Sequence, residues 1–126
     1  MKKRTIREEV IKLIYQDIIG GDFFSENQPN EVEELINDIR EKYQELDEII
    51  KSNLVKWTID RLNYVDLAII RYATYEMAYL STPSTVAINE ALEITKVYSN
   101  LDDDLAKKFN NRLLENIKNF LEKQNG

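Results

Sequence analysis

The sequence predicts an all-α fold, a bundle that forms a single domain over residues 1–126. Apolar residues recur at helical spacing from one end of the chain to the other. The chain has only three glycines and two prolines, which is too few for the many turns of a β-sandwich. Its apolar content of 43% and charged content of 32% are typical of a soluble globular protein.

The first predicted helix begins near Thr5 and ends at Gly20-Gly21. Thr5 and Glu8 fit a capping box, in which a hydroxyl and a carboxylate three residues later satisfy unpaired amides. Glycine tolerates the left-handed conformation that closes a helix. The apolar face of this helix consists of Ile6, Val10, Leu13 and Ile14.

A second helical pattern opens at Pro29-Asn30 and continues to Trp57. It is either one long helix or two short ones, and we favour two because Asp47 could cap a second segment. The residues in register are Val32, Ile36, Ile39, Tyr43, Leu46, Ile50, Leu54 and Trp57.

Asn63 is predicted to cap the next helix, which runs to about Leu80. This helix is apolar nearly all round, so we expect it at the centre of the bundle. Polar residues and a proline break the chain at residues 81–85. The fifth helix should bury Ala87, Ala91, Ile94 and Tyr98, and the last one Ala106, Phe109, Leu113, Ile117 and Phe120.

Composition excludes several classes of function. The chain has no cysteine, hence no disulfide framework, and no histidine, which removes the usual zinc ligands and the usual catalytic base. No apolar run is long enough to span a bilayer, and acids interrupt the N-terminal segment before it could act as a signal peptide. We therefore expect a cytoplasmic protein that is not an enzyme, binds no metal or cofactor and does not enter membranes.

Four cations open the chain, Lys2, Lys3, Arg4 and Arg7, although the protein has 23 acidic and 17 basic residues. If Thr5 caps the helix, Arg7 lies in its first turn, where the helix dipole favours anions. These cations therefore suit an external anion, because the helix-end amides point at the same space. RNA phosphate is the anion we expect. A solvated basic tail is the alternative, and charge alone favours it.

Two stretches resemble the NusB family of transcription antitermination factors: WTIDRLNYVDLAIIRYATYEM at residues 57–77 and VAINEALEITKVYS at residues 86–99. The opening RTIREEVIKLIYQ, residues 4–16, is similar to that family's basic first helix. The resemblance covers nearly the whole chain in the same order, and its most specific piece is AINEA at residues 87–91. It implies a bundle of six to seven helices that binds RNA and is not an enzyme.

The resemblance also implies partners and site residues. In this family the protein pairs with the ribosomal protein NusE, and the pair binds the boxA element of nascent RNA and helps RNA polymerase pass terminators. The expected RNA contacts are Lys2, Lys3, Arg4 and Arg7, together with Phe109 and Asn111, which match a Phe-Val-Asn-Gly motif in the last helix. The expected partner-facing residues are Tyr15, Asp66 and Asp102.

The chain departs from the family at that motif, which reads FNNR at residues 109–112. Asn110 replaces an aliphatic residue, and Arg112 replaces a glycine or another small residue. Arg112 must either widen the gap there or point outwards, where it could add an RNA contact. The preceding loop is longer than in the family, so any of Asp102, Asp103 and Asp104 could take the acidic role. Consecutive acids before a helix are usually a solvated cap region and not a metal site.

Arg71 lies within an otherwise apolar helix, where an unpaired charge would be costly. We expect it to be structural and to pair with an acid such as Glu90 or Glu76. Tyrosines could stack on single-stranded bases, but some belong to the core. By helical phase we expect Tyr43, Tyr72 and Tyr98 to be buried, whereas Tyr15, Tyr64, Tyr75 and Tyr79 could reach the surface.

The leading hypothesis is an antitermination factor that binds boxA-type single-stranded RNA together with NusE and supports transcription of rRNA operons. It would meet the RNA polymerase complex indirectly. The alternative is a protein-interaction adaptor with little RNA binding of its own. An accessory domain of an RNA-modifying enzyme is the weakest hypothesis, because the chain has no room for a cofactor-binding fold.

Overall fold

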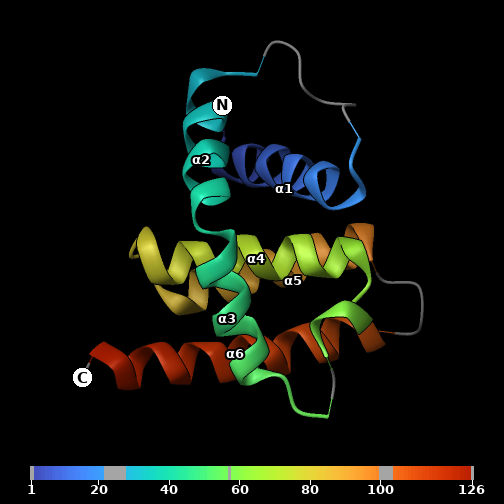
Figure 1. Ribbon diagram of the computed structural model, residues 1–126, viewed down its shortest axis with the longest axis vertical. Coiled ribbons are helices and arrows are strands. Elements are labelled where there is room, and N and C mark those ends of the chain that lie inside the picture. Colours follow the sequence, from blue (N-terminus) through green and yellow to red (C-terminus); the bar gives the residue numbers. More distant parts are fainter. Residues whose placement is uncertain (1, 22–27, 57, 100–103, 126) are drawn as a thin grey trace.

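Six α-helices and one short 3₁₀ helix make up the computed structural model (Figure 1), which describes residues 2–21, 28–56, 58–99 and 104–125. The helices are α1 (Lys3–Ile19), α2 (Asn30–Glu41), α3 (Tyr43–Asn53), η1 (Ile59–Arg61), α4 (Tyr64–Tyr79), α5 (Ser84–Tyr98) and α6 (Leu105–Asn125). Those four ranges contain no β-strand. The predicted all-α fold is therefore confirmed.

Helix α4 is the central element of the bundle, as its apolar sequence predicts. It packs against α1, α3, α5 and α6 (Figure 1). Ten of its 16 residues are buried. Asn63 caps it as predicted, because the Asn63 side-chain oxygen accepts a hydrogen bond of 2.7 Å from the Asp66 amide.

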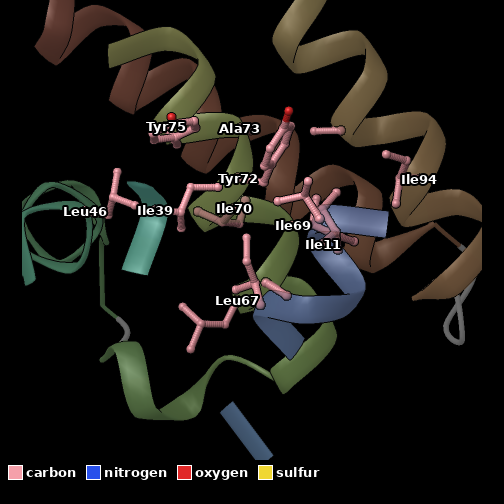
Figure 2. Packing of buried hydrophobic residues seen from close by; sticks show 14 of the residues in the cluster. Ile11, Ile39, Leu46, Leu67, Ile69, Ile70, Tyr72, Ala73, Tyr75 and Ile94 are labelled. Carbon is pink, nitrogen blue, oxygen red and sulfur yellow. The ribbon is translucent and has the colours of Figure 1, made fainter. Parts of the chain in front are cut away.

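One hydrophobic core joins the helices. Side chains from α1, α2, α3 and α5 converge on the apolar residues of α4 (Figure 2). Helix α6 adds Leu113, Leu114 and Ile117 to the same cluster. Each of the six α-helices is thus held mainly by the apolar face it buries.

The start of α1 differs from the prediction. The helix begins at Lys3 and not near Thr5, because the Ile6 amide donates a 3.0 Å hydrogen bond to the Lys2 carbonyl. Lys2 is the N-cap residue and makes no side-chain capping bond. Thr5 and Glu8 therefore lie inside the helix, and the capping-box prediction is wrong. The predicted end is confirmed, since Gly20 adopts a left-handed φ of 76° and its amide bonds to the Gln16 carbonyl.

The second helical pattern is two helices, as favoured, but the break lies at Lys42 and not at Asp47. Lys42 has φ −112° and ψ 5°, and its amide bonds to the Ile39 carbonyl at 2.8 Å. No glycine or proline marks this position. Asp47 lies inside α3, and Trp57 lies outside the described residues.

The predicted faces of α5 and α6 are confirmed in part. Ala87, Ala91, Ile94, Leu113 and Ile117 are buried, whereas Ala106, Phe109 and Phe120 are half-buried. Tyr98 is 45% exposed, which contradicts its predicted burial. It lies in the last turn of α5 and its hydroxyl reaches Glu8 on α1 at 3.1 Å.

Candidate RNA and partner interface

Three cations are exposed at the start of α1: Lys2, Lys3 and Arg4. The first turn of this helix contains no acidic residue, so no acid of the turn itself offsets these cations at the positive end of the helix dipole. Arg4 binds Glu90 of α5 through two hydrogen bonds, Nε to Oε1 at 3.1 Å and Nη2 to Oε2 at 2.5 Å. This contact raises the pKa of Arg4 and lowers the pKa of Glu90.

Arg7 is not available to a ligand in this structure, which corrects its predicted place among the RNA contacts. Its guanidinium binds Glu76 of α4 with two hydrogen bonds, of 2.6 and 3.0 Å, and this pairing raises the pKa of Arg7. The two side chains are only 10% and 4% exposed. Thr82 donates a further 3.0 Å hydrogen bond to Glu76. Arg7 is therefore a structural residue that fixes α1 against α4.

A groove of about 1200 Å³ runs beside these pairs, between α1, α2, α4 and α5. Lys3, Arg4 and Arg7 line it from α1, and Asn89 and Glu90 line it from α5. Its other acidic residues are Glu31, Glu34, Asp38 and Glu76. The cations of α1 are thus at the edge of a mainly acidic groove, which disfavours a polyanion along the rest of that groove.

A second groove, of about 310 Å³, is almost entirely apolar and includes Tyr15. It lies between α1, α4 and α5, and its apolar lining consists of Ile11, Tyr15, Ile19, Val65, Ala68, Ile69, Ile94 and Tyr98. Glu8 and Lys12 supply its charged groups. A concave apolar surface of this kind suits contact with another protein.

Asp66 is buried, so the structure does not present it to a partner. Its carboxylate accepts hydrogen bonds from Ser99 at 2.6 Å and from Asn110 at 3.0 Å. The Asn110 amide also donates to Thr95 at 3.1 Å. These polar groups tie α4 to α5 and α6, which corrects the expectation of a partner-facing carboxylate.

A small cationic pocket lies between α6 and residues 53–56, at and after the end of α3. Asn111 and Arg112 are exposed, and the half-buried Phe109 forms part of the wall. The pocket has a volume of about 290 Å³, and Lys56 lines it with Arg112. Its remaining lining residues are Asn53, Leu54, Val55, Leu113 and Asn116, so none of the described residues that line it is acidic. Asp102 and Asp103 lie outside the described residues.

Comparison with known proteins decides the family, because residues 2–119 match the sequence model of the NusB family. The chain belongs to the NusB family. The transcription antitermination protein NusB of Bacillus subtilis (strain 168) is 39% identical over 132 residues, which cover 97% of this chain and 98% of that protein. The protein of the same name from Listeria innocua is 36% identical, over 93% of this chain and 96% of its own length.

Solved structures show the same fold. The NusB structure of T. maritima has a TM-score of 0.83 and 28% identity, and the match covers 94% of this chain and 92% of that one. A chain in the crystal structure of a plectonemic RNA supercoil has a TM-score of 0.79 over 94% of both chains. At 24% identity the latter supports the fold alone. The Bacillus subtilis and Listeria innocua relatives both carry the name of transcription antitermination proteins.

The departures from the NusB motif at residues 109–112 have a structural explanation. Arg112 is exposed, so of the two predicted possibilities it points outwards. Asn110 is completely buried, and its amide donates to Asp66 and Thr95. The amide nitrogen of Asn110 is therefore accommodated at an aliphatic position of the NusB family by two buried acceptors, whereas its Oδ1 has no hydrogen-bond partner among the described residues.

Arg71 is structural, as predicted, but its partner is neither Glu90 nor Glu76. It binds Asp47 of α3 with two hydrogen bonds of 2.8 Å, and its guanidinium lies 4.6 Å from the centre of the Tyr43 ring. Glu76 and Glu90 hold Arg7 and Arg4 instead. These pairings were missed because the partners lie 69 and 86 residues apart, and no local pattern marks such pairs.

The tyrosines follow the prediction in part. Tyr72 is buried, while Tyr64 and Tyr79 are exposed, as expected. Tyr43 and Tyr15 are half-buried. Tyr75 is only 2% exposed and donates a 2.6 Å hydrogen bond to Asp38, so it cannot stack on a base.

Neither a metal site nor a membrane span is evident in the part of the chain that the structure describes. Among those residues no group of three or more carboxylates could hold a metal ion. None of the helices described there is both long enough and apolar enough to cross a bilayer.

Proposed function

We propose that this chain acts in the cytoplasm as a transcription antitermination factor that binds boxA-type single-stranded RNA jointly with the ribosomal protein NusE. The exposed cations at the start of α1 carry the proposal. Lys2, Lys3 and Arg4 oppose the helix dipole and so do not stabilise the helix, yet an RNA phosphate would meet both cations and helix-end amides there. Contact with the RNA polymerase complex is indirect in this scheme.

The cationic pocket on α6 supports a second RNA contact. Phe109 and Asn111 are the two residues that the family resemblance assigns to RNA, and the pocket adds Lys56 and Arg112 beside Phe109. The described lining of this pocket includes two cations and no acid, in a chain whose net charge is −6. Such a surface attracts a phosphate backbone.

The apolar groove at Tyr15 supports the partner contact. The α1 residues that line it lie between Glu8 and Ile19, whereas the exposed cations lie at the start of the same helix. A partner seated there would contact the helix whose first turn holds the RNA. The acidic bulk of the chain also favours a basic partner such as a ribosomal protein.

The test is a titration of fluorescently labelled boxA-type RNA with the protein, with and without NusE, at several salt concentrations. In the plot of log affinity against log salt, phosphate contacts from Lys2, Lys3 and Arg4 should together contribute at most about −2 to the slope. Lys3→Gln should weaken binding and make this slope shallower by about 0.7, the share of one phosphate contact. The matched control is Lys123→Gln, which removes the same charge from the exposed last turn of α6.

The adaptor remains the second candidate, because Arg4 and Arg7 are both paired with acids of their own chain. It predicts a saturable complex with NusE but no RNA binding by the free protein or by the complex. A large gain in RNA affinity on adding NusE supports joint binding. If Lys3→Gln and Lys123→Gln lowered the RNA affinity equally, the α1 cations would have no specific role in RNA binding.

A further inference from the structure

Glu90 occupies the position where a phosphate would bind Arg4. Its two carboxylate oxygens take the two guanidinium hydrogen bonds of Arg4, at 3.1 and 2.5 Å. A phosphate offers paired oxygens to the same fork of an arginine. Arg4 therefore cannot bind RNA through these nitrogens while Glu90 holds them.

The pair is nevertheless built so that Arg4 can leave. The Arg4 side chain is 53% exposed, and exposed ion pairs are weak because water screens them. Glu90 is 20% exposed and has a second cation, Arg7, whose Nη1 lies 3.4 Å from Glu90 Oε1. After Arg4 departs, the carboxylate would still have Arg7 beside it.

Arg7 itself stays in place during such an exchange. Glu76 holds it with two hydrogen bonds in a nearly closed environment. Arg7 thus keeps its partner Glu76, whereas the exposed Arg4–Glu90 pair can separate. Of the two arginines, only Arg4 can exchange its partner.

We propose that Glu90 competes with RNA phosphate for Arg4 and thereby weakens RNA binding by this protein. This inference rests on the proposed function, since it concerns the same RNA site. When RNA binds, Arg4 exchanges the carboxylate for a phosphate, and the released Glu90 lies close to a polyanion. Glu90 then keeps Arg7 beside it and attracts a cation from solution in place of Arg4, so fewer counterions are released overall.

The experiment compares wild type with Glu90→Gln in titrations of the labelled boxA-type RNA over a range of salt concentrations. Glu90→Gln should bind about fivefold more tightly at low salt, because Arg4 no longer has to give up an exposed ion pair, and this is the factor expected for one pair of unit charges about 4 Å apart in water. Its salt slope should be steeper by about 0.7, because one more counterion is released for each complex. Circular dichroism should show unchanged helicity, because Arg7 keeps Glu76.

Glu93→Gln is the matched control. Glu93 is an exposed acid on α5, one turn from Glu90, that acts on Arg4 through its charge but makes no hydrogen bond to it. Its loss should change RNA affinity much less than the loss of Glu90. If Glu93→Gln raised the RNA affinity as much as Glu90→Gln does, the effect would come from the net charge of the protein and the proposal would be overturned.

A double-mutant cycle shows whether Glu90 acts through Arg4. In the Arg4→Gln background, Glu90→Gln should give little further gain, because the contested cation is already absent. A full fivefold gain in that background would contradict the proposal. RNA binding by wild type without any gain in Glu90→Gln overturns this inference alone, whereas no RNA binding by any variant, with or without NusE, overturns the proposed function as well.

Discussion

Arg7 and Glu76 form an ion pair that is nearly closed off from water, with side chains 10% and 4% exposed. Arg4, three residues earlier on the same helix, pairs with Glu90 at the surface and is 53% exposed. Removing one member of a buried pair leaves an uncompensated charge, which is costly, whereas exposed pairs contribute little. The same residue type therefore stabilises the fold at one position and remains exchangeable at the other.

Arg7→Met should lower the free energy of unfolding by about 3–5 kcal/mol, because Glu76 stays buried without its partner. Arg4→Met should leave stability close to that of wild type. Urea unfolding followed by circular dichroism measures both variants. Replacing both members of the inner pair, as Arg7→Met/Glu76→Met, should recover much of the loss. If Arg7→Met were no less stable than Arg4→Met, the inner pair would have no structural role.

Single residues mark the limit of prediction from this sequence. The exposed cations at Lys2, Lys3 and Arg4 could be predicted, because charge sign and helix position are both local properties. The burial of Arg7 and Asp66 could not, because their partners come from other helices. The sequence indicates only that Asn110 stands at an aliphatic position of the family. Its polar neighbours Asp66 and Thr95 come from α4 and α5, which meet α6 only in the folded bundle.

At the scale of elements, Asp17 links the end of α1 to α2 and α3. Its carboxylate accepts two hydrogen bonds from Arg40, at 2.8 and 2.9 Å, and one from Tyr43 at 2.7 Å. Burial by itself would raise the pKa of Asp17, but the hydrogen bonds from Arg40 and Tyr43 outweigh it. The pKa therefore lies below its ordinary value of 3.8.

This depressed pKa predicts a loss of stability in acid. The contribution of Asp17 is complete above pH 3.8, its ordinary pKa, and disappears as the pH falls through the lower folded-state value. Asp17→Asn should cost about 1 kcal/mol at neutral pH, since solvent screens the partly exposed cluster. The difference in free energy of unfolding between wild type and Asp17→Asn should shrink as the pH falls below 3.8. Urea unfolding at several pH values measures it, and a difference that stays constant across this range would contradict the assignment.

Helix periodicity predicted the elements better than their ends. Spacing predicted most of the core faces of α4 and α5, with Tyr75 and Tyr98 as exceptions, and residue type predicted the caps at Gly20 and Asn63. The break between α2 and α3 at Lys42 has no such signal, because neither glycine nor proline lies there and no side chain caps either helix at that residue. Likewise, α1 begins at Lys3 without any capping side chain, so no motif could have marked its first residue.

For the whole molecule, the all-α class and the single core follow from one fact, that every helix has an apolar face and no helix can bury its face alone. The buried cluster contains residues from all six α-helices, including Ile14, Ile36, Ile50, Ile70, Ile94 and Ile117. Loss of any one helix would expose part of the apolar surface of the others. The bundle should therefore unfold as one unit.

The last prediction is a single cooperative transition in urea. Circular dichroism, which reports all helices, and aromatic fluorescence should give the same midpoint and the same free energy of unfolding. Ile70→Ala, at a fully buried position of α4, should shift both probes together by about 2–5 kcal/mol. Val97→Ala is the control, because Val97 is 72% exposed and its loss should change stability by no more than about 0.5 kcal/mol. Two separate transitions, or a variant that shifts only one probe, would mean that some helices fold apart from the α4 core.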